Sequence, residues 1–286
     1  MSAVATPSSL TTGDLIAWAE AKLEPVTNSA RLEAELLVAE TAGLGRASVM
    51  AHPERALSHE QASSYEALVT RRSRGEPMAY IIGRKEFYSL SLVVGPGVLV
   101  PRPETETLVD AALERIPGLD ASVLDLGTGS GAIALALKHE RPGLNVTAVD
   151  SDAAALEIAR TNADALGFDV NWLLSDWFSA LADQRFDLIV SNPPYVASGD
   201  AHFNESLAHE PRIALDGGID GLDAYREIFR KTLAHLAPDG WLLVEHGFDQ
   251  RDALSELAKT SGMRLSQCID DLAGLPRVAC FVAGAA

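Results

Sequence analysis

The later part of the chain alternates between short apolar segments and longer amphipathic ones, and this alternation constrains the fold more than any other feature. Each short segment is rich in Val, Leu and Ile, and most are followed by a stretch with apolar residues at helical spacing. The strand-like segments are ASVLDL at 121–126, NVTAVD at 145–150, VNWLLS at 170–175, FDLIVS at 186–191, WLLVEH at 241–246 and RVACFVA at 277–283. The pattern is typical of βαβ units and predicts an α/β fold, a mostly parallel sheet with helices on both faces.

The first part of the chain has a helical pattern without strand-like segments. Two apolar faces are expected, one of Leu15, Trp18, Ala19 and Leu23 and one of Leu32, Leu36 and Ala39. Ser58 and Gln61 match a capping box that begins a further helix. After Gly75-Glu76-Pro77, β-rich runs broken by glycine follow up to Val100. We predict a small all-helical domain at 1–75, a β-hairpin linker at 76–100 and the α/β domain at 101–286.

Composition excludes several classes of protein. The chain has 286 residues, 47% hydrophobic, which is enough for one large core and a small second one. Its net charge of −17 argues against stable nucleic-acid binding, which needs clustered Lys and Arg. Cys268 and Cys280 form no metal-ligand pattern, so no metal site is expected. MSAVATPSSL at the start lacks the features of a secretion signal, and no apolar run is long enough to span a membrane, so we expect a cytoplasmic protein.

A glycine-rich turn follows the first strand of the α/β part. In VLDLGTGSGAIALAL at 123–137, glycine permits a sharp bend and a close approach of a ligand to the backbone. Gly127, Gly129 and Ala132 also match GxGxxG/A, the fingerprint of dinucleotide-binding proteins, so a nicotinamide cofactor remains an alternative. A turn with a purely structural role is another alternative. Asp125, two residues before the first glycine, resembles the acid of the first motif of class I methyltransferases. In those enzymes the turn lies under the amino-acid part of S-adenosylmethionine.

Two further strand ends carry side chains suited to a nucleoside. Asp150 ends the second strand, where a carboxylate can accept hydrogen bonds from both hydroxyls of a ribose, although a helix N-cap role can coexist with this. Trp177 follows the third strand, where an indole can lie against an adenine ring; core packing is the alternative. Together with the turn, both positions favour an adenosine-containing cofactor.

The fourth strand runs into Asn192-Pro193-Pro194-Tyr195, the most informative tetrapeptide of the chain. The two prolines end the strand and form a stiff corner, which aims the Asn192 side-chain oxygen and the Pro193 carbonyl into the same space. Two acceptors, one for each N–H, can hold a planar NH₂ group in line with a sulfonium methyl and stabilise the developing charge on nitrogen. Tyr195 offers a ring face to the planar group. These features predict methylation of an amide or amino nitrogen.

At this point the sequence resembles the protein-glutamine N5-methyltransferase family, the release factor glutamine methyltransferases. The motifs that carry the resemblance include Asn192 to Tyr195, GEPMAYIIGRKEFYSL at 75–90, VPRPETETLVD at 100–110, SDWFSAL at 175–181, EPRIALDGGIDGLDAYREI at 210–228 and LLVEHG at 242–247. The resemblance implies an N-terminal helical domain that recognises release factors, followed along the chain by a class I methyltransferase domain with a seven-stranded sheet. It implies that S-adenosylmethionine contacts Gly127, Thr128, Gly129, Ser130, Gly131, Asp150, Trp177 and Asn192. Asn192, Pro193, Pro194 and Tyr195 are implied to hold the glutamine of a Gly-Gly-Gln loop.

Some positions and some functions stay open. Pro101 to Glu104 either form the lip of the cofactor cleft, with Glu104 near a helix start, or only begin a helix. The turns at Asp216 to Gly221 either cover the site or are static. For Glu245 and His246 a packed, hydrogen-bonded role is favoured over chemistry. A nucleic-acid amino methyltransferase is the nearest rival, because the same tetrapeptide can hold the NH₂ of a flipped base. Two further alternative functions are a non-catalytic nucleotide sensor and a nicotinamide-linked oxidoreductase.

Overall fold

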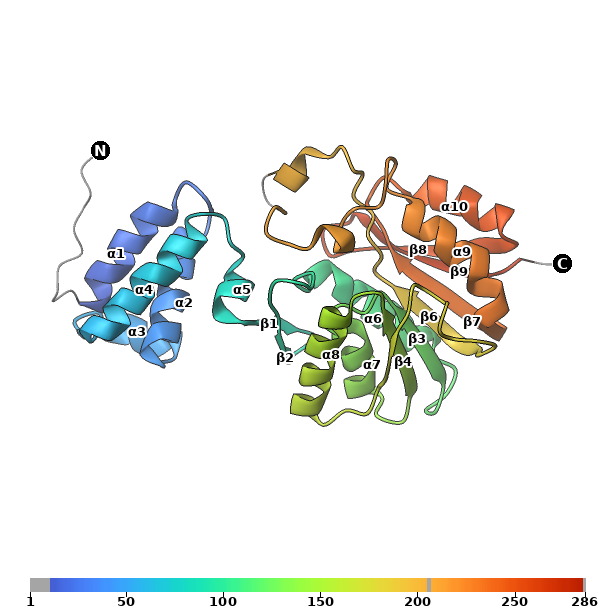
Figure 1. Ribbon diagram of the computed structural model, residues 1–286, viewed down its shortest axis with the longest axis horizontal. Helices are drawn as coiled ribbons and strands as arrows, with labels where there is room; N and C mark the ends of the chain where they lie inside the picture. The colour runs from blue at the N-terminus through green and yellow to red at the C-terminus, as the bar shows by residue number, and fades with distance from the viewer. Residues whose placement is uncertain (1–10, 205–206, 285–286) are drawn as a thin grey trace. The chain divides into compact units, whose positions relative to one another are not determined.

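Two units make up the chain in the computed structural model, which describes residues 11–204 and 207–284 (Figure 1). Contacts within the chain divide it at Gly83, so one unit ends there and the other starts at Arg84. The residues 1–10, in which no secretion signal was predicted, lie outside the described residues. The predicted division at 75 and 100 and the functions assigned to the parts stay predictions.

The first unit is built from helices. They are α1 (Thr12–Leu23), α2 (Ala30–Ala42), α3 (Arg46–Ala51), α4 (His59–Arg72) and α5 (Met78–Ile82). The capping box predicted at Ser58 and Gln61 is confirmed at the start of α4, and Thr11 and Asp14 form another at the start of α1. In both, a side-chain oxygen accepts from the backbone N–H three residues later, which satisfies a donor that has no partner inside the helix.

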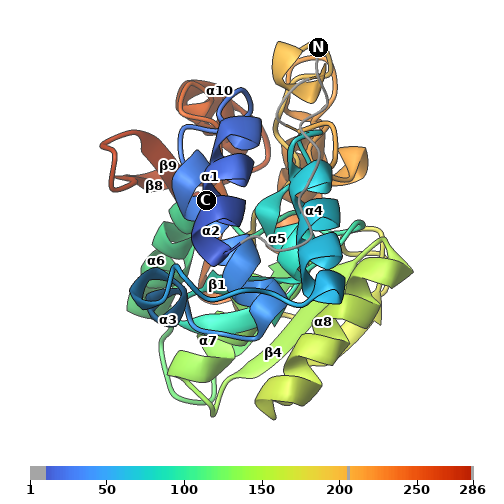
Figure 2. The same cartoon turned by 90° about the vertical axis from the view of Figure 1, so that its left-hand side faces the viewer.

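The core of the first unit lies between α1, α2 and α4, which pack side by side (Figures 1 and 2). The predicted face of α1 is confirmed for Leu15, Ala19 and Leu23. The predicted face of α2 is confirmed for Ala39 but wrong for Leu32, which is 41% exposed, and the buried face also carries Ala34, Leu37 and Val38. The buried Tyr65 of α4 packs against this face, and its hydroxyl donates to the Ala34 carbonyl at 3.2 Å, a close approach that the small Ala34 side chain permits.

The predicted hairpin forms over a shorter stretch than expected. β1 (Arg84–Phe87) pairs antiparallel with β2 (Leu90–Val93), whereas residues 78–82 form the helix α5, which ends at Gly83 with φ of 80°. The hairpin belongs to the second unit. Asn162, on a helix of that unit, fixes it: its amide accepts from Val93 N at 2.6 Å and donates to Val93 O at 3.0 Å.

The second unit contains the predicted seven-stranded, mostly parallel sheet, which is confirmed. Its strands are β3 (Ser122–Leu126), β4 (Asn145–Asp150), β5 (Asn171–Leu174), β6 (Phe186–Ser191), β7 (Leu236–Glu245), β8 (Met263–Asp270) and β9 (Pro276–Ala283). They lie in the order β5-β4-β3-β6-β7-β9-β8, with β9 antiparallel to its neighbours. β8 has no counterpart among the strand-like segments identified from sequence, because it is an edge strand with polar residues on both faces.

Helices cover both faces of this sheet (Figure 1). α6 (Glu106–Arg115), α7 (Ala132–Glu140) and α8 (Ala153–Leu166) pack on one face, and α9 (Asp223–His235) and α10 (Arg251–Thr260) on the other. Adjacent residues of β3 serve the two cores: Val123 belongs to the α7 side and Leu124 to the α9 side. Short 3₁₀ helices, η1 (Pro103–Thr105), η2 (Ala201–Asn204) and η3 (Arg212–Ala214), lie in the connecting segments.

Candidate active site

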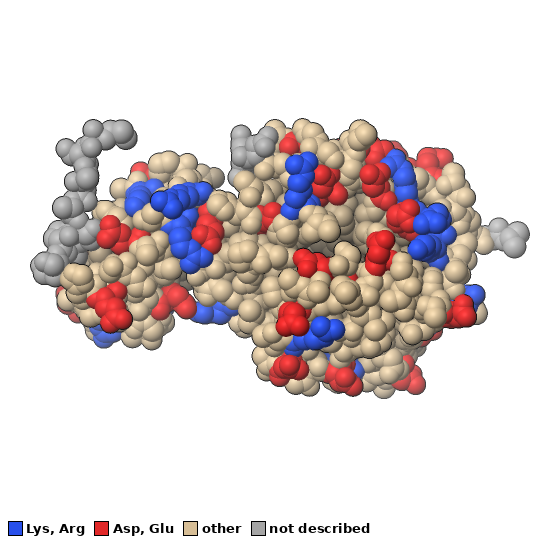
Figure 3. All heavy atoms as spheres, viewed as in Figure 1, with Lys and Arg blue, Asp and Glu red and all other residues tan. Residues whose placement is uncertain are grey.

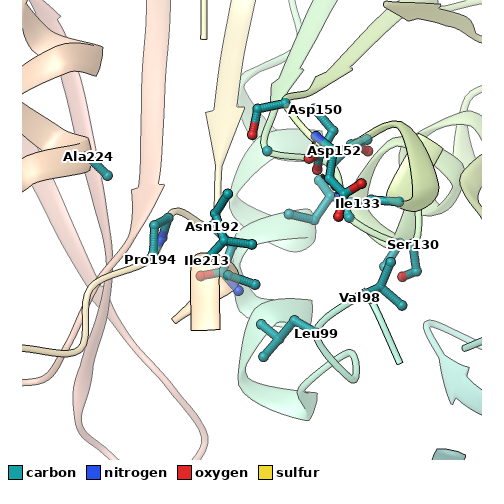
Figure 4. Close-up of a pocket in the computed structure, with 18 of the residues that line it drawn as sticks. Val98, Leu99, Ser130, Ile133, Asp150, Asp152, Asn192, Pro194, Ile213 and Ala224 are labelled. Carbon is teal, nitrogen blue, oxygen red and sulfur yellow. Dashed lines mark hydrogen bonds between the residues drawn. The ribbon is translucent and has the colours of Figure 1, made fainter. Parts of the chain in front are cut away.

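A cavity of about 390 Å³ opens at the carboxyl ends of the parallel strands (Figure 4). The chain passes from β3 outward to β4 and β5 on one side, and returns to β6 and β7 on the other. The crevice between β3 and β6 is therefore the topological switch point, where α/β sheets bind ligands. Figure 4 shows Asn192, Pro194 and Ile213 close together on one side of the cavity, with Ser130, Ile133, Asp150 and Asp152 across from them.

The glycine-rich turn forms one wall of the cavity. Gly127 and Gly129 have φ of 71° and 56°, and the N–H groups of Gly127 and Thr128 both donate to Val149 O at 2.9 Å. A Cβ on Gly131 would lie only 3.1 Å from Trp172 and 3.2 Å from Ala159, so the third glycine permits the close packing of the helix that follows. Gly127, Thr128, Gly129 and Ser130 line the cavity.

Asp125 lies beneath this turn and is fully buried. Its Oδ2 accepts from the Thr128 hydroxyl at 2.6 Å. Burial raises the pKa of this carboxyl to about 7, and the Thr128 hydroxyl offsets part of the shift. Asp125 therefore supports the turn from below, and among the described residues it is not one of those that line the cavity.

Asp150 joins the end of β4 to the turn. Its Oδ2 accepts from Gly129 N at 2.8 Å, and its Oδ1 accepts from Asp152 N at 2.9 Å. The N-cap of α8 is Asp152, whose side chain accepts from Ala154 N. The N-cap role considered for Asp150 is therefore filled by Asp152. Burial raises the pKa of Asp150, while the backbone N–H groups of Asp152 and Gly129 lower it. Each carboxylate oxygen keeps a second lone pair for a ligand.

Trp177 occupies the predicted strand-end position and lines the cavity. Its backbone has φ of 50°, a left-handed conformation that is costly for a bulky residue. Ser175 holds this turn, since its hydroxyl donates to Trp177 O at 2.8 Å and accepts from Ala180 N at 3.0 Å. The indole lies 4.0 Å from the place where a Cβ on Gly127 would be, so the ring stands beside the glycine turn.

The four residues of the Asn-Pro-Pro-Tyr corner are placed differently. Asn192 and Pro194 line the cavity, whereas Pro193 is buried and Tyr195 packs against the core on the α9 side. Asn192 Nδ2 donates to the Thr105 hydroxyl at 3.1 Å. Its Oδ1, which accepts no hydrogen bond from the described residues, is the free polar atom of this side chain. The Tyr195 hydroxyl donates to Glu245 Oε1 at 3.2 Å, and burial raises the pKa of Tyr195.

Other groups of the site were not identified from sequence. Glu210, 8% exposed, accepts from Val100 N at 2.9 Å and pairs with Arg102, which fixes the segment that borders the cavity. Thr105 lines the cavity and holds Asn192. Gln250 donates to Tyr195 O at 3.1 Å and to Gly221 O at 3.2 Å. Their partners lie far away in the sequence, so no local pattern indicates them.

The segment with the turns at Asp216 to Gly221 packs directly on the corner. Val196 N donates to Leu215 O at 2.9 Å, and Gly217 N donates to Val196 O at 2.8 Å. The Asp216 carboxylate accepts from the Ser198 hydroxyl at 2.6 Å and from Gly218 N at 3.0 Å. This segment braces residues 194–198. Asp216 lines the cavity, as do Ile213 and Ala214 just before it in the chain.

We expect Gly221→Ala to slow catalysis about 10-fold, because a misplaced reacting group costs rate steeply. Gly221 has φ of 74°, and a Cβ there would lie 2.4 Å from Tyr195 O, so the corner must shift. Gly274→Ala is the matched control: it has φ of 77° but no atom within 4 Å of the added Cβ. Both variants lose about 1–2 kcal/mol of stability through the left-handed backbone. Equal turnover in the two variants would contradict the bracing role.

Acidic side chains dominate the electrostatics of the cavity. Figure 3 shows a hollow in the second unit with Asp and Glu side chains at its rim. The acidic residues that line the cavity are Asp150, Asp152, Asp176, Asp216, Asp223 and Glu227. Among the described lining residues Arg102 carries the single Lys or Arg charge, and it pairs with Glu210. Such a cavity attracts a cationic ligand and repels phosphate.

Known proteins share both units of the chain. The family described as PrmC N-terminal domain matches residues 14–83, and the Methyltransferase small domain family matches residues 104–260. A release factor glutamine methyltransferase of Xylella fastidiosa is 46% identical over 87% of this chain and 91% of its own length. One of Escherichia coli is 44% identical over 80% of this chain and 84% of its own.

The chain belongs to the release factor glutamine methyltransferase family. The solved structure of a methyltransferase from Pyrococcus furiosus has the same fold, with a TM-score of 0.55 and 19% identity over 78% of this chain and all of the other. This family member is an enzyme, a methyltransferase that uses S-adenosylmethionine as methyl donor. Among the described residues no helix is long and apolar enough to cross a bilayer.

The residues of the cavity fit this cofactor. S-adenosylmethionine carries positive charge on its sulfonium and ammonium groups, which suits the acidic lining. Asp150 keeps lone pairs for ribose hydroxyls, and Trp177 provides an indole beside the turn. The cavity volume of about 390 Å³ is within the range of small-molecule sites.

Proposed function

We propose that the enzyme transfers a methyl group from S-adenosylmethionine to the side-chain amide N5 of the glutamine in the Gly-Gly-Gln motif of peptide chain release factors. The names of its relatives support a release factor as substrate. The observation that carries the proposal is the Asn192 amide, which lines the cavity while Thr105 holds its Nδ2. An acceptor fixed in this way suits an incoming amide N–H.

The roles of the cofactor-binding residues follow from their places around the cavity. We assign the amino-acid part of the cofactor to the turn Gly127 to Gly131, the ribose hydroxyls to Asp150 and the adenine to Trp177. Support comes from the free lone pairs of Asp150 and from the position of the Trp177 ring. S-adenosylmethionine supplies an electrophilic methyl group on a sulfonium sulfur.

Asn192 and its neighbours act on the nitrogen. A carboxamide nitrogen is a weak nucleophile because its lone pair is delocalised. In the proposed complex, Asn192 Oδ1 and the Pro193 carbonyl accept one N–H each and hold the nitrogen toward the methyl group. The two dipoles stabilise the positive charge that develops as the N–C bond forms and the C–S bond breaks. The nitrogen then loses one proton to water or a carbonyl. Pro194 and Tyr195 keep the corner in shape.

We assign recognition of the release factor to the helical unit and the place of action to the cytoplasm. The match of residues 14–83 to the PrmC N-terminal domain family, in a chain whose relatives are named release factor glutamine methyltransferase, supports the first assignment. The acidic lining of the cavity argues against methylation of a nucleic-acid base, because a flipped base brings its phosphates to the site, where the carboxylates repel them. No stable nucleic-acid binding is therefore expected.

Labelled methyl transfer tests the proposed function. The enzyme is incubated with S-adenosylmethionine carrying a labelled methyl group and with a purified release factor, and peptides are sequenced by mass spectrometry. We expect one label on the side-chain nitrogen of the Gly-Gly-Gln glutamine and none in a release factor with glutamate there. Label on another residue, or none, would overturn the proposal.

A further inference from the structure

The Gln250 side chain joins three segments at the Asn-Pro-Pro-Tyr corner. Its Nε2 donates to Tyr195 O at 3.1 Å and to Gly221 O at 3.2 Å. Its Oε1 accepts from Gly247 N at 2.9 Å. Tyr195 is the last residue of the corner, Gly221 lies just before α9, and Gly247 follows β7. One side chain therefore ties the corner to the segments on either side of it.

The turn from Gly247 to Gln250 gives this side chain a fixed starting point. Gln250 N donates to Gly247 O at 2.9 Å, so the two residues are bonded through the backbone as well as through the side chain. The turn joins β7 to α10, of which Gln250 is the N-cap residue. β7 pairs in parallel with β6, the strand that leads into the corner. The Gln250 amide is thus anchored on the strand next to the corner.

The three partners of Gln250 require an amide. Tyr195 O and Gly221 O only accept hydrogen bonds, whereas Gly247 N only donates, so the side chain must offer two donors on one branch and an acceptor on the other. A glutamine offers both, and these partners fix the direction of its amide. An ionised glutamate has the same shape but would place a carboxylate oxygen against two carbonyl oxygens.

The corner has few other backbone groups by which it can be held. Pro193 and Pro194 have no N–H, and their rings fix φ at two positions. A shift at Tyr195 is therefore passed on to the Pro193 carbonyl and to Asn192 instead of being absorbed between them. The contact is tight, since a Cβ on Gly221 would lie 2.4 Å from Tyr195 O and 2.7 Å from Gln250 Nε2. A displacement of about 1 Å at a reacting group can cost about 100-fold in rate.

We propose that Gln250 is a positioning residue for methyl transfer, which holds the Tyr195 carbonyl and thereby the direction of the Asn-Pro-Pro-Tyr corner. Gln250 is not among the described residues that line the cavity, so it acts through the corner. That the corner holds the substrate amide rests on the proposed function.

Two variants test the proposal by single-turnover methyl transfer at saturating release factor. Gln250→Met keeps the length of the side chain and removes its hydrogen bonds, and Gln250→Glu keeps the shape and replaces the donors. We expect each to lower the rate about 10-fold at a pH of about 8. S-adenosylmethionine affinity and stoichiometry, measured by calorimetry, should stay unchanged. A merely structural role would instead lower the rate and the stoichiometry together, in proportion to the loss of folded protein.

The pH profile separates loss of the donor from general damage. Once protonated, the carboxyl introduced by Gln250→Glu has an O–H group and can again donate to Tyr195 O or Gly221 O. Its rate relative to the wild type should therefore rise as the pH is lowered from about 8 to about 6, whereas the relative rate of Gln250→Met should stay constant. The wild type carries the same titratable and charged neighbours, so their effect is shared: His246, Asp249, Arg251 and Asp220.

Gln267→Glu is the matched control for the change of charge. Gln267 Oε1 accepts from Arg115 Nη2 at 2.5 Å, and an acceptor oxygen survives the substitution. Gln267 lies on the edge strand β8 and, in the described part of the chain, is not part of the cavity lining. We expect normal turnover of the control. A normal rate in Gln250→Met, or a relative rate of Gln250→Glu that does not change with pH, would overturn the proposal.

Hydrogen exchange gives a readout that needs no substrate. Val196 N donates to Leu215 O at 2.9 Å and Gly217 N donates to Val196 O at 2.8 Å, so these two amides report on the corner. In the full chain with S-adenosylmethionine bound, we expect peptides with these amides to exchange about 10-fold faster in Gln250→Met than in the wild type or in Gln267→Glu. Equal exchange would refute the positioning role. Faster exchange without methylation of any release factor by the wild type would instead refute the proposed function.

Discussion

Asn192→Ala is expected to reduce methyl transfer by a factor on the order of 100 or more, as loss of one preorganised hydrogen-bonding group does in other enzymes. Asn192 lines the cavity, and the single hydrogen bond of its side chain with the described residues goes to Thr105. Its removal deprives the substrate amide of an acceptor where positive charge develops. The fold should stay intact, and we expect the loss in the rate of methyl transfer.

Single-turnover methyl transfer to a purified release factor measures this effect. Asn171→Ala is the matched control, because Asn171 also donates from Nδ2 to a threonine hydroxyl, that of Thr147, at 3.3 Å. Asn171 starts β5 and, among the described residues, is not part of the cavity lining. We expect the control to turn over normally. Near-normal turnover in Asn192→Ala itself would rule out the assigned role.

Asp150→Asn is expected to weaken S-adenosylmethionine binding on the order of 100-fold, or about 2.7 kcal/mol. The two oxygens of Asp150 accept from Gly129 N and from Asp152 N. An asparagine has one acceptor oxygen, so its NH₂ group must face one of these two N–H donors. The turn then opens, and the negative charge that favours ribose hydroxyls is lost.

Calorimetry with S-adenosylmethionine checks this expectation. Asp187→Asn provides the control, since Asp187 Oδ2 also accepts from a backbone N–H, that of Ser122, at 2.8 Å. Ser122 starts β3, at the end of the sheet away from the cavity. Because burial raises the pKa of Asp150, the affinity of the wild type should also fall as the pH drops through that pKa. Unchanged affinity in Asp150→Asn would remove Asp150 from the cofactor site.

Much of the fold could be predicted from local patterns. The strands β3, β4, β6, β7 and β9 lie where apolar runs indicated them, because a strand buried on both faces must be apolar along its length. The edge strand β8 gave no such signal. α5 was predicted as part of a hairpin, since a five-residue helix is too short to show a helical period. The buried face of α2 is decided by packing against other helices, among them α4 with the buried Tyr65, and such packing leaves no local signal.

The candidate site likewise contains residues that local sequence patterns indicate and residues that only the tertiary structure reveals. Sequence alone indicated that the glycine turn, Asp150, Trp177 and Asn192 lie at one edge of the sheet, because each follows a strand and the carboxyl ends of parallel strands meet there. Residues 127–130 of the turn and these three side chains line the cavity. Only the tertiary structure showed that Thr105, Glu210, Glu245 and Gln250 hold these groups in place. The hydrogen bonds of Thr105 with Asn192, of Glu210 with Val100, of Glu245 with Tyr195 and of Gln250 with Tyr195 each join residues 50 or more positions apart. A local pattern indicates what a strand end can present, whereas the direction in which that group points depends on partners that the fold brings together.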